Sequence, residues 1–127
     1  MLLADVVATS ERVGSTRSRK AKTAALAELL AAMDSIETGI GVAYLAGELP
    51  QGRIGLGYAA VYAVEIGPAS DPSLTLRRVN TALTEIASIS GPGSKAARHE
   101  TLAGLLSHAT EAEQTFLRRL ILRELRQ

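Results

Sequence analysis

Two pairs of glycines in this sequence have the spacing of a turn that can hold a phosphate group. The pairs are Gly55 with Gly57 and Gly91 with Gly93, and a helix is expected to begin directly after each pair. Glycine permits positive φ angles and lets another molecule come close to the backbone. The first turn of a helix adds unpaired N–H groups and a partial positive charge. Each segment is therefore a candidate seat for an anion.

Cationic and hydroxyl side chains stand beside both glycine pairs. Arg53 precedes the first pair, and Ser94, Lys95 and Arg98 follow the second. Helix-hairpin-helix proteins hold the DNA backbone with the same Gly-x-Gly arrangement. An ordinary turn between two packed helices would also use these glycines, so that interpretation stays open. The repetition, each time with an adjacent cation, favours contact with a phosphate backbone.

Other reactive groups are missing or badly spaced. The chain has no cysteine, and His99 and His108 are too far apart for an i, i+4 metal pair. Glu111 and Glu113 point to different helix faces, so we interpret them as capping and solvated residues. The second glycine segment lacks the spacing of an ATP-binding P-loop and follows a helix instead of a strand. We expect no catalytic residue and no metal site in this chain.

Basic residues are clustered although the net charge is only +1. One cluster has no acid after Glu11 until Glu28: Arg12, Arg17, Arg19, Lys20 and Lys22. A second region, from Arg77 to Arg98, contains four basic residues and a single acid. A third lies at the C-terminal end: Arg118, Arg119, Arg123 and Arg126. Solvated helix faces explain any one cluster, whereas the segregation of charge permits a basic face for a polyanion.

The elements that must position these groups are predicted to be helices throughout. Apolar residues recur at i, i+3, i+4 and i+7, and alternation of period two is nowhere sustained. Four sets follow this spacing: Leu26, Leu29, Leu30 and Met33; Val42, Leu45, Ala46 and Leu49; Val79, Ala82, Leu83 and Ile86; Leu102, Leu105, Leu106 and Ala109. We expect about seven helices, at roughly residues 2–13, 17–33, 36–47, 57–65, 75–89, 94–107 and 110–126.

Capping and turn residues agree with these bounds. Capping boxes are predicted at residues 34–37 and 110–113, and the prolines near residues 68–72 divide the chain into two halves. The last predicted helix places Arg119, Arg123 and Arg126 on one face, at i, i+4 and i+7. A buried stripe is expected beside them: Leu117, Ile121 and Leu125. Because no Gly, Asn or Pro ends this helix, the chain resembles a domain excised from a longer protein.

Three of these segments carry a family resemblance. They are residues 109–127, the turn at 91–94 with Arg98 and Leu102, and residues 45–50 with the turn at 54–57. In this order they resemble the N-terminal DNA-binding domain of bacterial ATP-dependent DNA ligases, most closely those of actinobacteria. The sequence departs from that pattern at Arg123, where the family usually has glycine before Glu-Leu-Arg.

The resemblance implies one all-α domain over residues 1–127, with two pseudo-symmetric halves, lying across the minor groove opposite a nick. It implies contact with the backbone of duplex or nicked DNA at eight residues: Arg53, Gly55, Gly57, Gly91, Gly93, Ser94, Lys95 and Arg98. The arginines of the last helix are further candidates: Arg119, Arg123 and Arg126. Since a ligase must close nicks in any sequence, we expect phosphate contacts without a base code.

Catalysis is expected elsewhere in the parent protein. Ligases of this family attach AMP to the lysine of a Lys-x-Asp-Gly motif, and none of Lys20, Lys22 and Lys95 has Asp two positions later. The resemblance therefore implies catalytic domains in cis that use ATP and magnesium, in a monomeric cytoplasmic protein of DNA repair, replication or recombination. No stretch is apolar enough to cross a membrane.

Two other functions fit a helical chain. One is a protein-interaction module whose glycine turns only connect helices and which does not bind DNA. The other is a helix-turn-helix regulator, which needs base-reading Arg, Asn or Gln side chains at the start of its recognition helix. The helices after the glycine turns begin Tyr-Ala-Ala and Ser-Lys-Ala-Ala instead.

Overall fold

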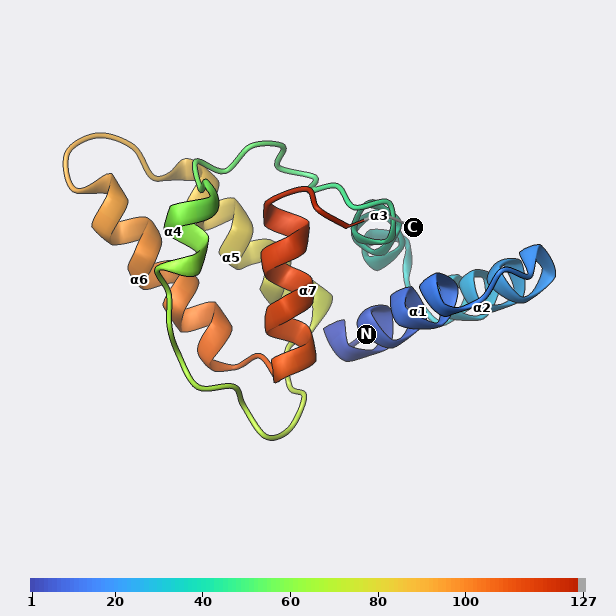
Figure 1. Cartoon of the computed structure of the whole chain (residues 1–127). Coiled ribbons are helices and arrows are strands. Elements are labelled where there is room, and N and C mark those ends of the chain that lie inside the picture. Colours follow the sequence, from blue (N-terminus) through green and yellow to red (C-terminus); the bar gives the residue numbers. More distant parts are fainter. Residues whose placement is uncertain (126–127) are drawn as a thin grey trace.

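The computed structural model describes residues 1–125 and contains seven helices (Figure 1). They are α1 (Leu3–Ser15), α2 (Arg19–Ala31), α3 (Ser35–Leu45), α4 (Tyr58–Tyr62), α5 (Leu76–Ser88), α6 (Ser94–Ser107) and α7 (Glu111–Ile121). Within residues 1–125 there is no strand, and a single antiparallel bridge joins Leu2 to Thr75. No helix in this part of the chain is long and apolar enough to cross a membrane. The all-α prediction is confirmed, and six helices begin and end within three residues of their expected bounds.

The two predicted capping boxes start α3 and α7. Asp34 accepts a bond from the Glu37 N–H at 2.8 Å, and Glu37 accepts one from the Asp34 N–H at 3.2 Å. Thr110 and Glu113 make the same exchange, at 3.3 and 2.8 Å. Arg77 of α5 donates to Asp34 at 2.7 Å, which ties the start of α3 to α5. Each helix therefore has a defined first turn.

These contacts also act on the acidic groups themselves. The ammonium group of Met1 bonds the Glu37 carboxylate, and this contact, with the Asp34 N–H, lowers the pKa of Glu37. The Glu37 N–H and then Arg77 lower the pKa of Asp34. Both carboxylates are thus stabilised in the charged form that the capping bonds require.

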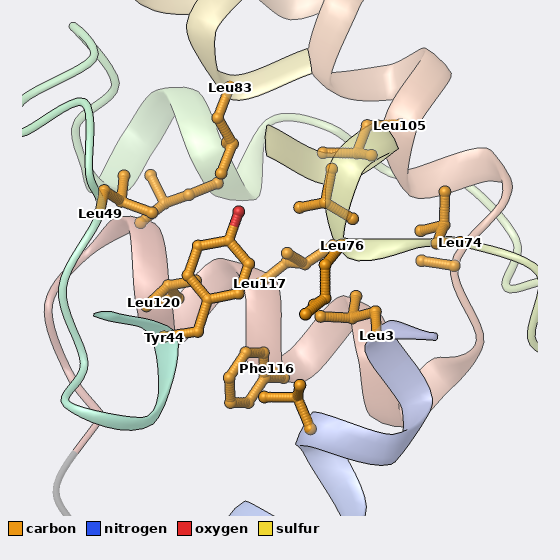
Figure 2. Packing of buried hydrophobic residues seen from close by; sticks show 14 of the residues in the cluster. Leu3, Tyr44, Leu49, Leu74, Leu76, Leu83, Leu105, Phe116, Leu117 and Leu120 are labelled. Carbon is orange, nitrogen blue, oxygen red and sulfur yellow. The ribbon is translucent and has the colours of Figure 1, made fainter. Parts of the chain in front are cut away.

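One apolar core contains residues of all seven helices, and Figure 2 shows part of it. Every helix except α2 contributes a fully buried side chain; in chain order these include Leu3, Tyr44, Val61, Leu76, Leu106 and Leu117. The hydroxyl of Tyr44 is buried without a hydrogen-bond partner among the described residues, and burial raises its pKa. Helix α2 contributes little, since only Ala25 and Leu29 are buried in it. The core therefore holds the two halves of the chain together, and α2 lies at its margin.

The predicted apolar stripe on α3 is wrong in part. Val42 is 48% exposed and Ala46 is exposed, whereas Ile40 and Tyr44 are buried. The buried face includes Gly41, where a Cβ would lie 2.7 Å from the sulfur of Met33, so the helix packs closely through a residue that hydropathy does not mark. By contrast, all four residues of the set in α6 are buried: Leu102, Leu105, Leu106 and Ala109.

The predicted end of the last helix is also wrong, because α7 stops at Ile121. Leu122 is its C-cap, and Arg123 adopts the left-handed conformation with φ of 57°. The N–H of Arg123 donates to Leu120 O at 3.1 Å, and the N–H of Glu124 donates to Arg119 O at 2.8 Å. These two bonds are those of a Schellman motif, which usually places glycine where Arg123 stands. An arginine in that position concealed the helix end from sequence reasoning.

Candidate nucleic-acid interface

The fold brings the two glycine turns together. Residues from both turns, with Ala60 and Ala63 of the α4 segment and the start of α6, line one hollow of about 560 Å³. Gly55 and Gly93 both lie on it, and both have left-handed backbone, with φ of 80° and 79°. Segments that are distant in the sequence therefore form a single surface, as two cooperating phosphate seats would require.

The second turn is open to solvent. Gly91 and Gly93 both have positive φ, and a Cβ added at either would meet nothing within 4 Å. Ser94 donates its N–H to Gly91 O at 3.2 Å and begins α6. No side chain caps this helix and no acid stands in its first turn, while Lys95 is exposed beside the hollow. The N-terminus of α6 thus faces the hollow with its partial positive charge uncompensated.

The loop that contains the first turn is anchored to the core and to α5. Ile54 is buried, and Gln51 donates to Asn80 Oδ1 at 2.7 Å and to Thr84 Oγ1 at 3.0 Å, so the loop between α3 and α4 is fixed to α5. Gly57 is the N-cap of α4 with extended backbone, φ of −94°. Gly57 therefore leaves space at the surface but does not need a left-handed conformation.

Arg98 joins the two turns instead of projecting from them. A Cβ on Gly55 would lie 2.9 Å from Nε and 3.0 Å from Cζ of Arg98, so the guanidinium packs directly on the Gly55 backbone. Its Nη2 donates to Ile89 O at 2.8 Å, at the end of α5. Its Nε is buried and has no hydrogen-bond partner among the described residues. The predicted contact residue Arg98 is thus positioned to fix the geometry of the two turns relative to one another.

Two further arginines stand beside the first turn. A second hollow, of about 440 Å³, is lined by Arg53, by the first glycine turn and by Arg123. Both arginines are exposed. The turn at the end of α7 is what brings Arg123 to this place, so it belongs with Arg53 rather than with a helix face.

Arg119 lies apart from this surface. It lines a separate groove of about 400 Å³ between α1 and α7, which also contains Glu11 and Glu124. The predicted face shared by Arg119 and Arg123 is therefore wrong, since α7 ends between them. Arg126 lies outside the described residues.

Comparison with known proteins adds the decisive observation. Residues 56–127 match the family model for the DNA ligase N terminus. The chain belongs to this family. It is 54% identical over 127 residues to a protein named probable DNA ligase from Nocardia farcinica, and 50% and 49% identical to proteins of the same name from Saccharopolyspora erythraea and Beutenbergia cavernae. The expected resemblance to actinobacterial ligases is confirmed.

The alignments cover all of this chain but only 24 or 25% of each of those three relatives. The chain thus spans about a quarter of the length of the curated relatives it matches. Among the described residues, no group of three or more His, Cys, Asp or Glu side chains is placed to hold a metal ion.

The two histidines lie apart. His99 lines the larger hollow beside Lys95, and Nδ1 of His108 lies 3.0 Å from Gly104 O.

In this DNA ligase N-terminal domain, sequence reasoning missed an aromatic group next to the first turn. Tyr58 follows Gly57 directly and is 65% exposed, and its ring lies 4.6 Å from that of Tyr62. Arg118 stands 5.6 Å from the centre of the Tyr62 ring and donates to Val64 O at 2.6 Å. The sequence has only three tyrosines, so two at i, i+4 beside a glycine turn were the available signal.

Proposed function

We propose that this domain binds duplex and nicked DNA through the phosphate backbone, without reading bases, and positions a nick for the catalytic part of a DNA ligase. The supporting observation is that Arg98 joins the two glycine turns around one hollow. Family membership gives DNA as the substrate of the parent protein.

The chemistry of the surface suits phosphate oxygens. At the second turn, the left-handed Gly91 and Gly93 and the uncapped start of α6 offer backbone N–H donors, to which a phosphate can come close because no side chain intervenes there. Lys95 lies beside the second turn, while Arg53 and Arg123 lie beside the first. Because residues of both turns line one hollow, two phosphates of one duplex could be held at the same time. The first turns of α4 and α6 contain no Arg, Asn or Gln, the side chains expected at the start of a recognition helix.

Sealing of the nick is assigned to the remainder of the parent chain. None of the three lysines of this domain has the Asp two positions later that the ligase nucleotidyl motif requires. ATP, magnesium and nucleotidyl transfer therefore belong to catalytic domains supplied in cis, in a parent that acts as a monomer at the nucleoid in repair, replication or recombination. In this proposal the present domain contributes the grip and the orientation of the DNA.

Titration of fluorescent duplexes at several salt concentrations tests this function. On a duplex of about 10 base pairs, neutralisation of three phosphates by Arg53, Lys95 and Arg123 gives a slope of log affinity against log salt of about −3. Dissociation constants are expected near ~10⁻⁴ to 10⁻⁶ M at physiological salt, and equal for two unrelated sequences. A flat salt response, or a strong preference for one sequence, would overturn the proposal and favour an interaction module or a regulator.

A further inference from the structure

The hairpin of α1 and α2 carries a basic patch of its own. Figure 1 shows the turn between these helices at the end of the hairpin that points away from the other helices. Near this turn stand four cations without an intervening acid: Arg17, Arg19, Lys20 and Lys22. Arg17, Arg19 and Lys20 are exposed, and we call these three the hairpin tip. Among the described residues, none of the three forms an ion pair.

The hairpin tip has a charge that local helix chemistry does not explain. α2 begins after its N-cap Ser18, and its first turn contains no acid but does contain Arg19 and Lys20. The N-terminus of a helix carries partial positive charge, so cations there are unfavourable for the helix itself. Arg12, nearer the core, differs because it lines a groove that also contains Asp5 and Glu28. The uncompensated charge is therefore confined to the tip, where an anionic partner would account for it.

The arrangement fits an extended polyanion better than a compact one. In Figure 1 the second glycine turn, before α6, and the hairpin tip lie at opposite ends of the molecule. A free phosphate or a small acidic protein reaches one of these places, whereas a duplex long enough to pass along the domain reaches both. The 13 residues of α2 extend about 20 Å, equivalent to about six base pairs at ~3.4 Å each.

We propose that the hairpin tip binds phosphates of the same duplex that the glycine turns hold, farther along that duplex. This inference rests on the function proposed above. It assigns the tip a role in extending the contact along DNA, with each phosphate contact adding about 0.9 to the salt slope.

The test measures how tightly the 127-residue chain and its variants bind duplexes of two different lengths. The variant Arg17→Gln/Arg19→Gln/Lys20→Gln should bind a duplex of about 10 base pairs within about twofold of the unmodified chain, because that length does not reach the tip. On about 30 base pairs it should bind about tenfold more weakly at low salt, with a slope shallower by about 2 to 3. Two single substitutions that remove the same charge form a matched pair: Arg17→Gln at the tip and Arg78→Gln on α5. Arg78 is exposed and lies outside these surfaces. Only Arg17→Gln should weaken binding to the long duplex.

Equal affinity of the triple variant and the unmodified chain for the long duplex would overturn the hairpin contact and leave the glycine-turn function standing. An equal loss on both lengths would also overturn it, since the effect would then be one of net charge. Vesicles of anionic phospholipid provide the other arm: binding to vesicles through the tip, without dependence on duplex length, would assign the tip to a membrane surface. If the unmodified chain binds neither duplex, the proposed function itself fails.

Discussion

The two glycine turns share a sequence pattern but differ in what fills the space that glycine leaves. At the first turn, the Arg98 guanidinium packs on Gly55 and occupies the place of a side chain. At the second, the space beside Gly91 and Gly93 is open. Gly55 of the first turn therefore serves internal packing, while the glycines of the second turn leave room for a molecule from outside. One pattern can thus have two physical causes, and each cause predicts a different response to substitution.

Gly55→Ala tests the internal cause and should have the largest effect on folding. The new methyl group is strained at φ of 80° and collides with the guanidinium of Arg98. Strain of about 1 kcal/mol and a similar cost of displacing the buried side chain give a loss of about 2 kcal/mol in the free energy of unfolding. Urea unfolding measures it.

Gly52→Ala is the matched control for this substitution. Gly52 has φ of 72° in the same loop, and a Cβ there meets nothing within 4 Å. Its replacement should cost only the strain, about 1 kcal/mol. Equal losses in the two variants would show that the contact with Arg98 contributes nothing.

Arg98→Lys separates positioning from charge. Lysine keeps the positive charge but lacks the planar guanidinium that covers Gly55 and reaches Ile89 O. Misplacement of the seats should lower the affinity for duplex DNA about tenfold, which is ~1.4 kcal/mol, without changing the salt slope. Lys95→Ala, in contrast, should make the slope shallower by about 0.9. A shallower slope for Arg98→Lys would make Arg98 a direct phosphate contact.

The sequence predicted the helices well because their causes are local. Capping boxes depend on residues three apart, and the apolar repeat of α6 depends on one face of a single helix. Both glycine turns were found for the same reason. Two other features depend on packing between distant segments. They are the contact of Arg98 with Gly55 and the position of Arg123 beside the first turn. No spacing along the chain contains that information.

The end of α7 illustrates the same limit. Gly47 after α3 and Arg123 after α7 occupy the same position in two Schellman motifs, with φ of 77° and 57°. In the sequence, glycine at this position predicts a helix end, whereas arginine does not. Moreover, a Cβ on Gly47 would lie 3.0 Å from Leu125 O, so the segment after α7 packs on the turn after α3.

Arg123→Gly should move stability and DNA binding in opposite directions. Removing the Cβ relieves the left-handed strain, which should raise the free energy of unfolding by about 1 kcal/mol. The same change removes a cation beside Arg53, so the salt slope should become shallower by about 0.9. Unfolding and binding titrations on one preparation give both values. A gain in stability with an unchanged slope would remove Arg123 from the interface.

Gly57→Ala is expected to have the smallest effect on folding, and it tests the open glycine of the first turn, where Gly55→Ala tests the packed one. Gly57 has extended backbone, and a Cβ added there meets nothing within 4 Å, so only the lower preference for alanine at an N-cap should act, and the free energy of unfolding should fall by about 0.5 kcal/mol. If a phosphate approaches this backbone, the added methyl group should still weaken binding to duplex DNA by about threefold, while leaving the salt slope unchanged because no cation is lost. Gly67→Ala, in the open loop after α4, is the control and should change neither property. Equal DNA affinity of Gly57→Ala and Gly67→Ala, with both folded, would confine the seat at the first turn to Gly55 and its arginines.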